Sequence, residues 1–151
     1  MLTDIWVFRT SMKRGIRMIN GRKQVLLQDD INAQADIQWR MHTNATVSID
    51  ATGTTATLTL GGKTLQAQLL NAPSGAKFTT QAATRLPTDP ALPANQSDQE
   101  NPGVTVLTIA LGQGTYSLQV LFNPQWDGMS SGSFQTPAAV PLDNWSLTSH
   151  S

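Results

Sequence analysis

The segment from Ile37 to Thr43 most constrains the fold of this chain, because apolar and polar residues alternate along it. One set of alternate positions is apolar and the other is polar: Ile37, Trp39 and Met41 against Gln38, Arg40 and His42. Successive side chains of a β-strand point to opposite faces. The segment therefore predicts a strand with a core face and a polar face that carries an arginine and a histidine.

Two more strands are predicted just before this segment, so that Arg14 to Thr43 forms three consecutive strands. Alternation predicts the first from Arg14 to Ile19, and Asn20-Gly21 supplies the positive φ angles that a tight hairpin turn needs. Val25-Leu26-Leu27 has apolar residues on both faces, which is typical of a central strand. This strand is predicted to end at Gln28-Asp29-Asp30, before a polar turn.

The rest of the chain alternates short strand patterns with turn signals. Strands are predicted at residues 5–8, 45–49, 56–60, 65–69, 76–79, 104–111 and 116–122. The alternation changes phase at Thr43-Asn44, which is consistent with a β-bulge. No segment keeps a period of 3.6 residues, so no helix is predicted. These patterns predict an all-β fold, an antiparallel β-sandwich of about eight to ten strands.

The length of 151 residues fits a single domain over residues 1–151. Residues 84–103 contain four prolines and few large apolar residues, which predicts an irregular loop, either functional or a tolerated insertion. From residue 124 the chain predicts an extended tail rich in Pro, Ser and Gly. Its aromatic residues Trp126, Phe134 and Trp145 are predicted to anchor the tail; the alternative is a platform that stacks sugars.

Charge is balanced overall but unevenly distributed. All ten basic residues lie at or before Arg85 with five acidic residues, and the other five acidic residues follow it. The basic residues before residue 86 are predicted to form either an anion-binding patch or a face covered by the acidic segment that follows Arg85. A nucleic-acid partner is not expected, because the chain is neutral and has few aromatics and no recognition helix. A membrane partner is not expected either, because no apolar run approaches the roughly 18 residues that cross a bilayer.

Three features of the sequence bear on cellular location. The first residues place Asp4 early and positive charges after the apolar run, which is not the order of a signal peptide. The absence of cysteine does not decide the compartment. Three sequons, at Asn44, Asn95 and Asn144, are predicted acceptors for N-glycosylation and favour an extracellular origin.

The sequence predicts no catalytic residue, no cofactor and no metal site. Only two histidines are present, His42 and His150, and neither belongs to an HxH or HExxH motif. Asp29 and Asp30 are adjacent on a strand, so their side chains point to opposite faces and cannot converge on one ion. Motifs of nucleophilic catalysis and of phosphate-binding loops are missing.

A binding surface is the remaining candidate site. Its predicted members are basic and polar residues of the first three strands: Arg17, Arg22, Lys23, Gln38, Arg40 and His42. Such a face would bind an anion or a sugar. The alternative for His42 is a hydrogen-bonded residue in a cross-strand pair.

Three segments resemble the C-terminal β-sheet region of heparinase II/III-like polysaccharide lyases. They are Arg14-Gly15-Ile16, the VLLQDDI segment from Val25 to Ile31, and the QWRMHT segment from Gln38 to Thr43. Segments 104–111 and 118–126 are compatible, so the resemblance covers residues 5 to 126. It implies a β-sandwich from an enzyme that cleaves uronic-acid polysaccharides by β-elimination.

The resemblance does not carry a catalytic site to this chain. In the family the catalytic tyrosine and histidine come largely from an α/α-toroid, and 151 residues leave no room for one. The HxH-type segment of the family's active site has no match here, and His42 matches only the WRMHT strand. The chain is therefore expected not to be an enzyme on its own.

Three hypotheses follow for function. The first is a non-catalytic sandwich domain of a lyase-like protein that binds acidic polysaccharide. The second is a stand-alone, lectin-like secreted protein that binds an acidic or neutral polysaccharide. The third is an immunomodulatory or other interaction protein that uses the loop at 84–103 or forms a homo-oligomer through its sheet edges.

Overall fold

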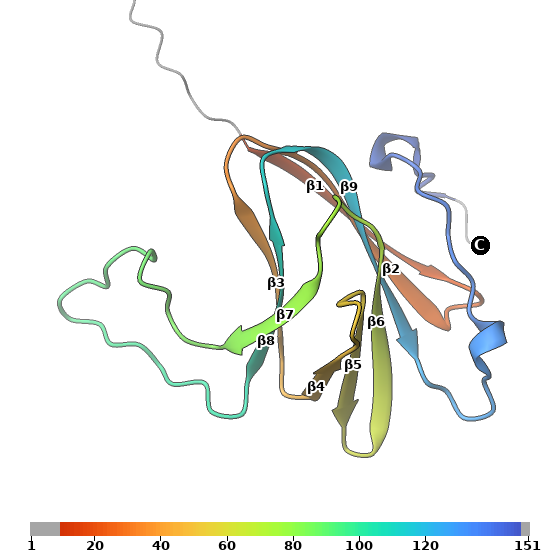
Figure 1. Cartoon of the computed structure of the whole chain (residues 1–151), viewed down its shortest axis with the longest axis horizontal. Helices are drawn as coiled ribbons and strands as arrows, with labels where there is room; N and C mark the ends of the chain where they lie inside the picture. Colours follow the sequence, from red (N-terminus) through yellow and green to blue (C-terminus); the bar gives the residue numbers. More distant parts are fainter. Residues whose placement is uncertain (1–9, 149–151) are drawn as a thin grey trace, which may run out of the picture.

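The computed structural model describes residues 10–148, and within them the fold consists of two antiparallel β-sheets (Figure 1). The strands are β1 (Ser11–Ile19), β2 (Gln24–Ala33), β3 (Ile37–Thr43), β4 (Thr46–Ile49), β5 (Thr55–Leu60), β6 (Lys63–Asn71), β7 (Phe78–Ala82), β8 (Thr105–Leu111) and β9 (Gly114–Pro124). Two short 3-10 turns, η1 (Ser131–Ser133) and η2 (Leu142–Asn144), lie in the tail. The segment at residues 5–8 that was predicted as a strand lies outside the described residues.

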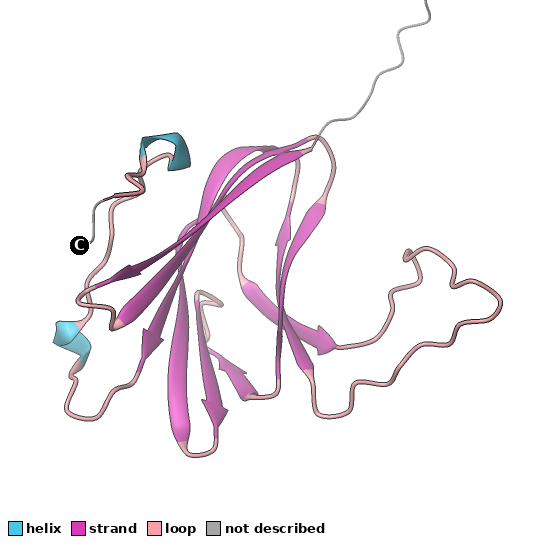
Figure 2. Ribbon diagram, turned by 180° about the vertical axis from the view of Figure 1, so that it is seen from behind, coloured by secondary structure: helices cyan, strands magenta, loops and turns pink. Residues whose placement is uncertain are grey.

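The larger sheet has the order β1-β2-β9-β6-β5-β4 and the smaller sheet the order β3-β8-β7. Figures 1 and 2 show the smaller sheet at one side of the molecule and the long strands β2, β9 and β6 at the other. The two sheets share one apolar core, in which the Trp39 and Phe78 rings pack edge to face at 6.4 Å. The prediction of an all-β antiparallel sandwich is therefore confirmed.

Strands β8 and β2 contain runs of apolar residues and lie inside their sheets, with a neighbouring strand on each side. β8 is the middle strand of the smaller sheet, and its residues Val106, Leu107 and Ile109 have no exposed surface. β2 pairs with β1 on one side and with β9 on the other. The prediction that β2 ends at Gln28-Asp29-Asp30 is wrong, because the strand continues to Ala33. These polar residues have hydrogen-bond partners within β2 and on the neighbouring strands β1 and β9.

The first hairpin turn is longer than the sequence predicts. Asn20 and Gly21 have φ angles of 54° and 62°, as a turn with positive φ requires, and Arg22 follows at 67°. The turn closes when the Lys23 N–H donates to the Asn20 carbonyl at 3.3 Å. Four residues therefore connect β1 to β2, which pair again at Ile19 and Gln24.

The phase change at Thr43-Asn44 is a crossing between sheets and not a bulge. β3 belongs to the smaller sheet and β4, only three residues later, to the larger one. The Thr43 hydroxyl accepts a hydrogen bond from the Ala45 N–H at 3.0 Å across this connection. A strand that changes sheet must also change which side chains face the core, and this produces the shift in the sequence pattern.

The C-terminal tail crosses back over the outer face of β1, β2 and β9, on the side away from the smaller sheet (Figures 1 and 2). Trp145 packs with Ile19, Leu26 and Leu121 in a second small apolar cluster. The Trp126 indole N–H donates to the Lys23 carbonyl at 2.9 Å. Both tryptophans hold the tail against the sandwich.

Substitution of Gly15 is expected to disturb this packing. An added Cβ would collide with the tip of Leu142 and would lie 2.9 Å from Cζ3 of the Trp145 ring. We expect Gly15→Ala to lower the free energy of unfolding by about 1 kcal/mol, measured by urea denaturation. Gly112→Ala is the control, because its Cβ would meet only Asp36 Oδ1 at 3.9 Å. Equal stability of the two variants would contradict the packing of the tail on Gly15.

Low pH is expected to weaken the attachment of the tail to Asp30, whose carboxylate accepts a hydrogen bond from the Leu142 N–H. Burial opposes ionisation of this carboxyl, but hydrogen bonds from the Leu142 N–H, Gln28 and Ser117 outweigh it, so the pKa of Asp30 is lowered. The stabilisation is present above the unfolded-state pKa of about 3.9 and is lost as the pH falls through the lower folded-state pKa. We expect the hydrogen-exchange protection of the Leu142 amide to fall between about pH 5 and about pH 2.5.

Asp30→Asn provides the control for this pH effect, because it removes the charge that titrates. Lys13, opposite Asp30 on β1, stays charged throughout the range and also pairs with Asp143 at 2.7 Å. If the hydrogen-exchange protection of the Leu142 amide in the unchanged protein is the same at both pH values, the Asp30 contact is not the source of that protection.

Candidate functional site

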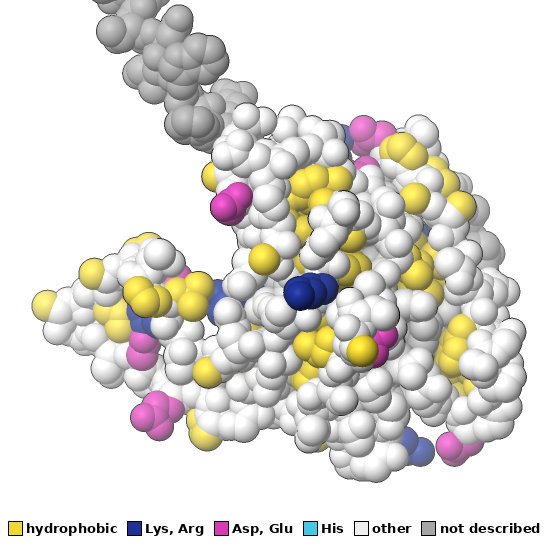
Figure 3. Space-filling model, viewed as in Figure 1, with side chains coloured by type: hydrophobic (Ala, Val, Ile, Leu, Met, Phe, Trp, Pro, Cys, Tyr) yellow, Lys and Arg dark blue, Asp and Glu magenta, His cyan; other side chains and the backbone are white. Residues whose placement is uncertain are grey.

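A cavity of about 490 Å³ lies between the polar face of β3 and the loop at 84–103. Its lining combines cations, carboxylates and amides: Arg40, His42, Ala82, Ala83, Thr84, Arg85, Asp89, Asp98, Gln99, Glu100, Asn101, Pro102 and Val104. Figure 3 shows the loop projecting from the body of the sandwich, with basic and acidic side chains on it. This volume lies within the range of about 300–1,000 Å³ that is common for small-molecule sites.

The position of Arg40 follows from the strand alternation of β3. Trp39 and its alternate neighbours Ile37 and Met41 pack into the core, which turns the Arg40 side chain to the outer face. Its Nε atom is buried and has no hydrogen-bond partner, and within residues 10–148 its guanidinium forms no ion pair. A guanidinium carries five donors and no acceptor. Arg40 therefore presents an uncompensated positive charge to the cavity.

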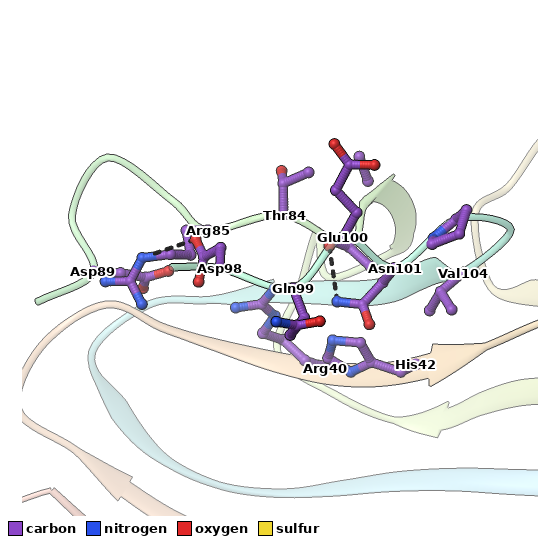
Figure 4. A pocket seen from close by; sticks show the side chains of 13 residues that line it. Arg40, His42, Thr84, Arg85, Asp89, Asp98, Gln99, Glu100, Asn101 and Val104 are labelled. Atoms are coloured by element: carbon purple, nitrogen blue, oxygen red, sulfur yellow. Dashed lines mark hydrogen bonds and ion pairs between the residues drawn. The ribbon is translucent and has the colours of Figure 1, made fainter. Parts of the chain in front are cut away.

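The loop above Arg40 presents amides to it. Figure 4 shows Gln99 and Asn101 between the loop and β3, with Gln99 beside the Arg40 side chain. The Asn101 amide donates to the Ala83 carbonyl at 3.4 Å, which helps to hold the loop over the strand. Amide groups supply both hydrogen-bond donors and acceptors, so this side of the cavity can bind hydroxyl groups.

Two of the three acidic residues of the lining have partners within the loop. Asp98 pairs with Arg85 at 3.3 Å, and Asp89 accepts a hydrogen bond from the Leu86 N–H at 2.7 Å. Both lie at the far end of the cavity from His42, and Glu100 points away from β3 (Figure 4). The carboxylates therefore do not neutralise Arg40.

The polar surface continues from the cavity over the outer face of the smaller sheet. Gln81 on β7 donates to Gln38 on β3 at 3.2 Å, and the exposed Thr79 bonds through its hydroxyl to the buried Thr108 at 2.7 Å. Gln38 and His42 are exposed. Together with Arg40 they form one row along β3 that a chain-like ligand can follow.

The six predicted binding residues fall into two groups on different sheets. Gln38, Arg40 and His42 lie together on β3. Arg17 lies on β1 with its guanidinium 5.2 Å from the centre of the Trp145 ring, and Arg22 and Lys23 lie in the turn that follows β1. β1 and β3 belong to different sheets, and binding of one ligand by all six residues stays a prediction.

Sequence reasoning did not identify Gln99 and Asn101 as site residues. They lie in the irregular loop at 84–103, and the signal that pointed to them was only the length and proline content of that loop. The three predicted glycosylation sites are exposed: Asn44 lies between β3 and β4, Asn95 in the same loop, and Asn144 in η2.

Asp29 and Asp30 point to opposite faces of β2, as strand geometry predicts. Asp29 pairs with Arg14 on the inner side, whereas Asp30 accepts the Leu142 N–H of the tail on the outer side. Within the described residues no three His, Asp or Glu side chains gather to hold a metal ion. His150 lies outside these residues.

Sequence comparison does not assign the chain to a known family. No protein-family model matches the chain, and no curated protein sequence matches it. The resemblance to heparinase II/III-like lyases therefore stays a prediction. Among residues 10–148, no helix is both long enough and apolar enough to cross a membrane.

Proposed function

We propose that this chain is a non-catalytic β-sandwich domain that binds acidic polysaccharide in the cavity between β3 and the loop at 84–103. The resemblance to the sandwich of heparinase II/III-like lyases suggests the ligand class, a polymer that contains uronic acid. The observation that carries the proposal is Arg40, whose guanidinium lines the cavity without an ion-pair partner among the described residues.

The chemistry of the lining fits a uronate unit. A carboxylate accepts two parallel hydrogen bonds from a guanidinium, and such charge-assisted bonds are among the stronger ones in proteins. The Gln99 and Asn101 amides lie where they can exchange hydrogen bonds with sugar hydroxyls. The exposed row of Gln38 and His42 extends the contact to neighbouring units of a polymer.

A lectin-like protein for neutral sugars is the second candidate function. The observation that favours it is the acidic part of the lining, since Asp89 and Asp98 accept hydrogen bonds and disfavour an anionic ligand nearby. The two candidates differ in their dependence on salt, because only binding through charge weakens as counterions screen it.

Affinity electrophoresis distinguishes the two candidates. We expect the chain to be retarded in a gel that contains a polyuronate and to migrate freely in a gel that contains a neutral glucan. Added salt should reduce the retardation. Retardation by the neutral glucan alone would support the lectin-like candidate, and free migration in both gels would overturn the proposal.

A further inference from the structure

The outer face of β2 and β9, under the C-terminal tail, is mostly polar and yet buried. Its apolar residues Leu26 and Leu121 lie opposite each other and belong to the small cluster with Trp145. The three glutamines Gln24, Gln28 and Gln119 are at most 1% exposed, and Asn123 is 4% exposed. They interact with one another between the two strands: Gln28 lies opposite Gln119, and the side chain of Gln24 reaches that of Asn123. The Gln119 amide donates to Gln28 at 2.9 Å, and the Gln24 amide donates to Asn123 at 2.7 Å.

These side chains contact the tail through its backbone. Gln24 donates to the Gln135 carbonyl at 3.0 Å and accepts from the Gln135 N–H at 2.9 Å, as a neighbouring strand would. Gln28 donates to the Val140 carbonyl at 2.8 Å, and Asp30 accepts from the Leu142 N–H at 2.8 Å. Every one of these contacts is available to an extended peptide of different sequence.

Apolar packing of the tail is concentrated at its ends. Phe134 is half-buried at one end, and Leu142 and Trp145 pack over Gly15 at the other. Most residues between these ends are exposed: Gln135, Thr136, Ala138, Ala139 and Val140. The preceding turn contains Gly128, at a φ of 80°, and Gly132, and it is exposed apart from Met129. Segments with few buried apolar contacts open locally at low free energy.

The polarity of the covered face decides what happens when the tail leaves. An apolar face would be exposed to water at a high cost, which scales with its area. Amide side chains exchange their protein hydrogen bonds for bonds to water, so the net cost is small. Detachment of the tail therefore exposes mainly amide side chains, with Leu26 and Leu121 as the apolar part, and leaves the main core between the sheets covered.

We propose that the outer face of β2 and β9 is a groove for an extended peptide and that residues 133–145 are its built-in, exchangeable occupant. The second occupant is the same segment of a second copy of the chain, because this sequence already matches the groove along its length. In one molecule the attached tail competes at an effective concentration of the order of millimolar. Exchange therefore requires that the anchor at Trp145 is weakened or that the tail opens transiently.

A labelled peptide with the sequence of residues 131–147 tests the groove. We expect Trp145→Ala in the full chain to tighten binding of this peptide at least tenfold relative to the unchanged chain, measured by fluorescence anisotropy. Adding Gln28→Ala should reverse the gain, whereas adding Gln113→Ala, at an exposed hairpin residue, should not. Failure of the peptide to bind the Trp145→Ala chain, or binding unaffected by Gln28→Ala, would overturn the proposal.

Hydrogen exchange of the unchanged protein gives a test that does not depend on a variant. The Gln135 and Leu142 amides are both bonded to groove side chains. We expect them to exchange at least tenfold faster than the amides of Leu118 and Val120 in the core of β9. Exchange of all four amides only through global unfolding would show that the tail does not open and would overturn the proposal.

Discussion

Replacing Arg14 with alanine is expected to lower the free energy of unfolding by about 3 kcal/mol. The Arg14 guanidinium donates to both carboxylate oxygens of Asp29, at 2.7 and 2.8 Å. Asp29 has no exposed surface, whereas 41% of the Arg14 side chain is exposed. The substitution leaves a buried carboxylate without its partner, and the exposure of Arg14 keeps the loss at the lower end of the range for buried pairs.

Lys13→Ala is the matched control on the same strand. Lys13 pairs with Asp143 at 2.7 Å, but both side chains are mostly exposed. Exposed pairs contribute about 0–1 kcal/mol, so this variant should remain close to the unchanged protein in urea denaturation. Equal losses in the two variants would show that Asp29 does not depend on Arg14.

The second large effect is expected at Arg40. We expect Arg40→Ala to weaken binding of an oligouronate at least tenfold, or about 1.4 kcal/mol. The Arg40 guanidinium lines the cavity and has no ion-pair partner among the described residues. Arg40→Lys should recover only part of the affinity, because an ammonium group lacks the planar fork that matches a carboxylate. Isothermal titration calorimetry measures both variants.

Arg22→Ala serves as the control for charge. Arg22 is an exposed arginine in the turn before β2, on the other sheet from Arg40. Losing it changes the net charge by the same amount and leaves the cavity intact. Equal weakening by Arg22→Ala and Arg40→Ala would mean that binding follows net charge and not the site.

Local alternation made the fold predictable. Side chains of a strand alternate between its two faces, and residues 37–43 of β3 alternate between apolar and polar types in the same way. The same alternation predicted that Asp29 and Asp30 face apart. β8 was predicted as a strand, and its apolar residues on both faces agree with its position in the middle of the smaller sheet.

Contacts between segments far apart in the sequence could not be predicted from the pattern of neighbouring residues. Gln28 is buried because Val140, 112 residues later, lies over it, and no local signal marks this pairing. The polar run at Gln28-Asp29-Asp30 therefore had the pattern of a strand end, although it lies inside β2. Similarly, the phase change at Thr43 fits either a bulge or a crossing, and only the pairing of β4 with β5 decides between them.

The candidate site was predictable only in part for the same reason. The β3 row of Gln38, Arg40 and His42 follows from alternation. Grouping it with Arg17, Arg22 and Lys23 required the relative placement of two sheets, which charge spacing does not contain. Gln99 and Asn101 reach the site through the path of an irregular loop, and such paths depend on tertiary contacts.

The most direct test of polysaccharide binding at β3 is a two-dimensional amide NMR titration of the chain with an oligouronate. Binding in the cavity predicts that the largest shift changes cluster at Arg40, His42, Gln99 and Asn101, and that they are absent in the Arg40→Ala variant. Shift changes centred on Arg22 and Lys23, or no changes at saturating oligouronate, would contradict the account.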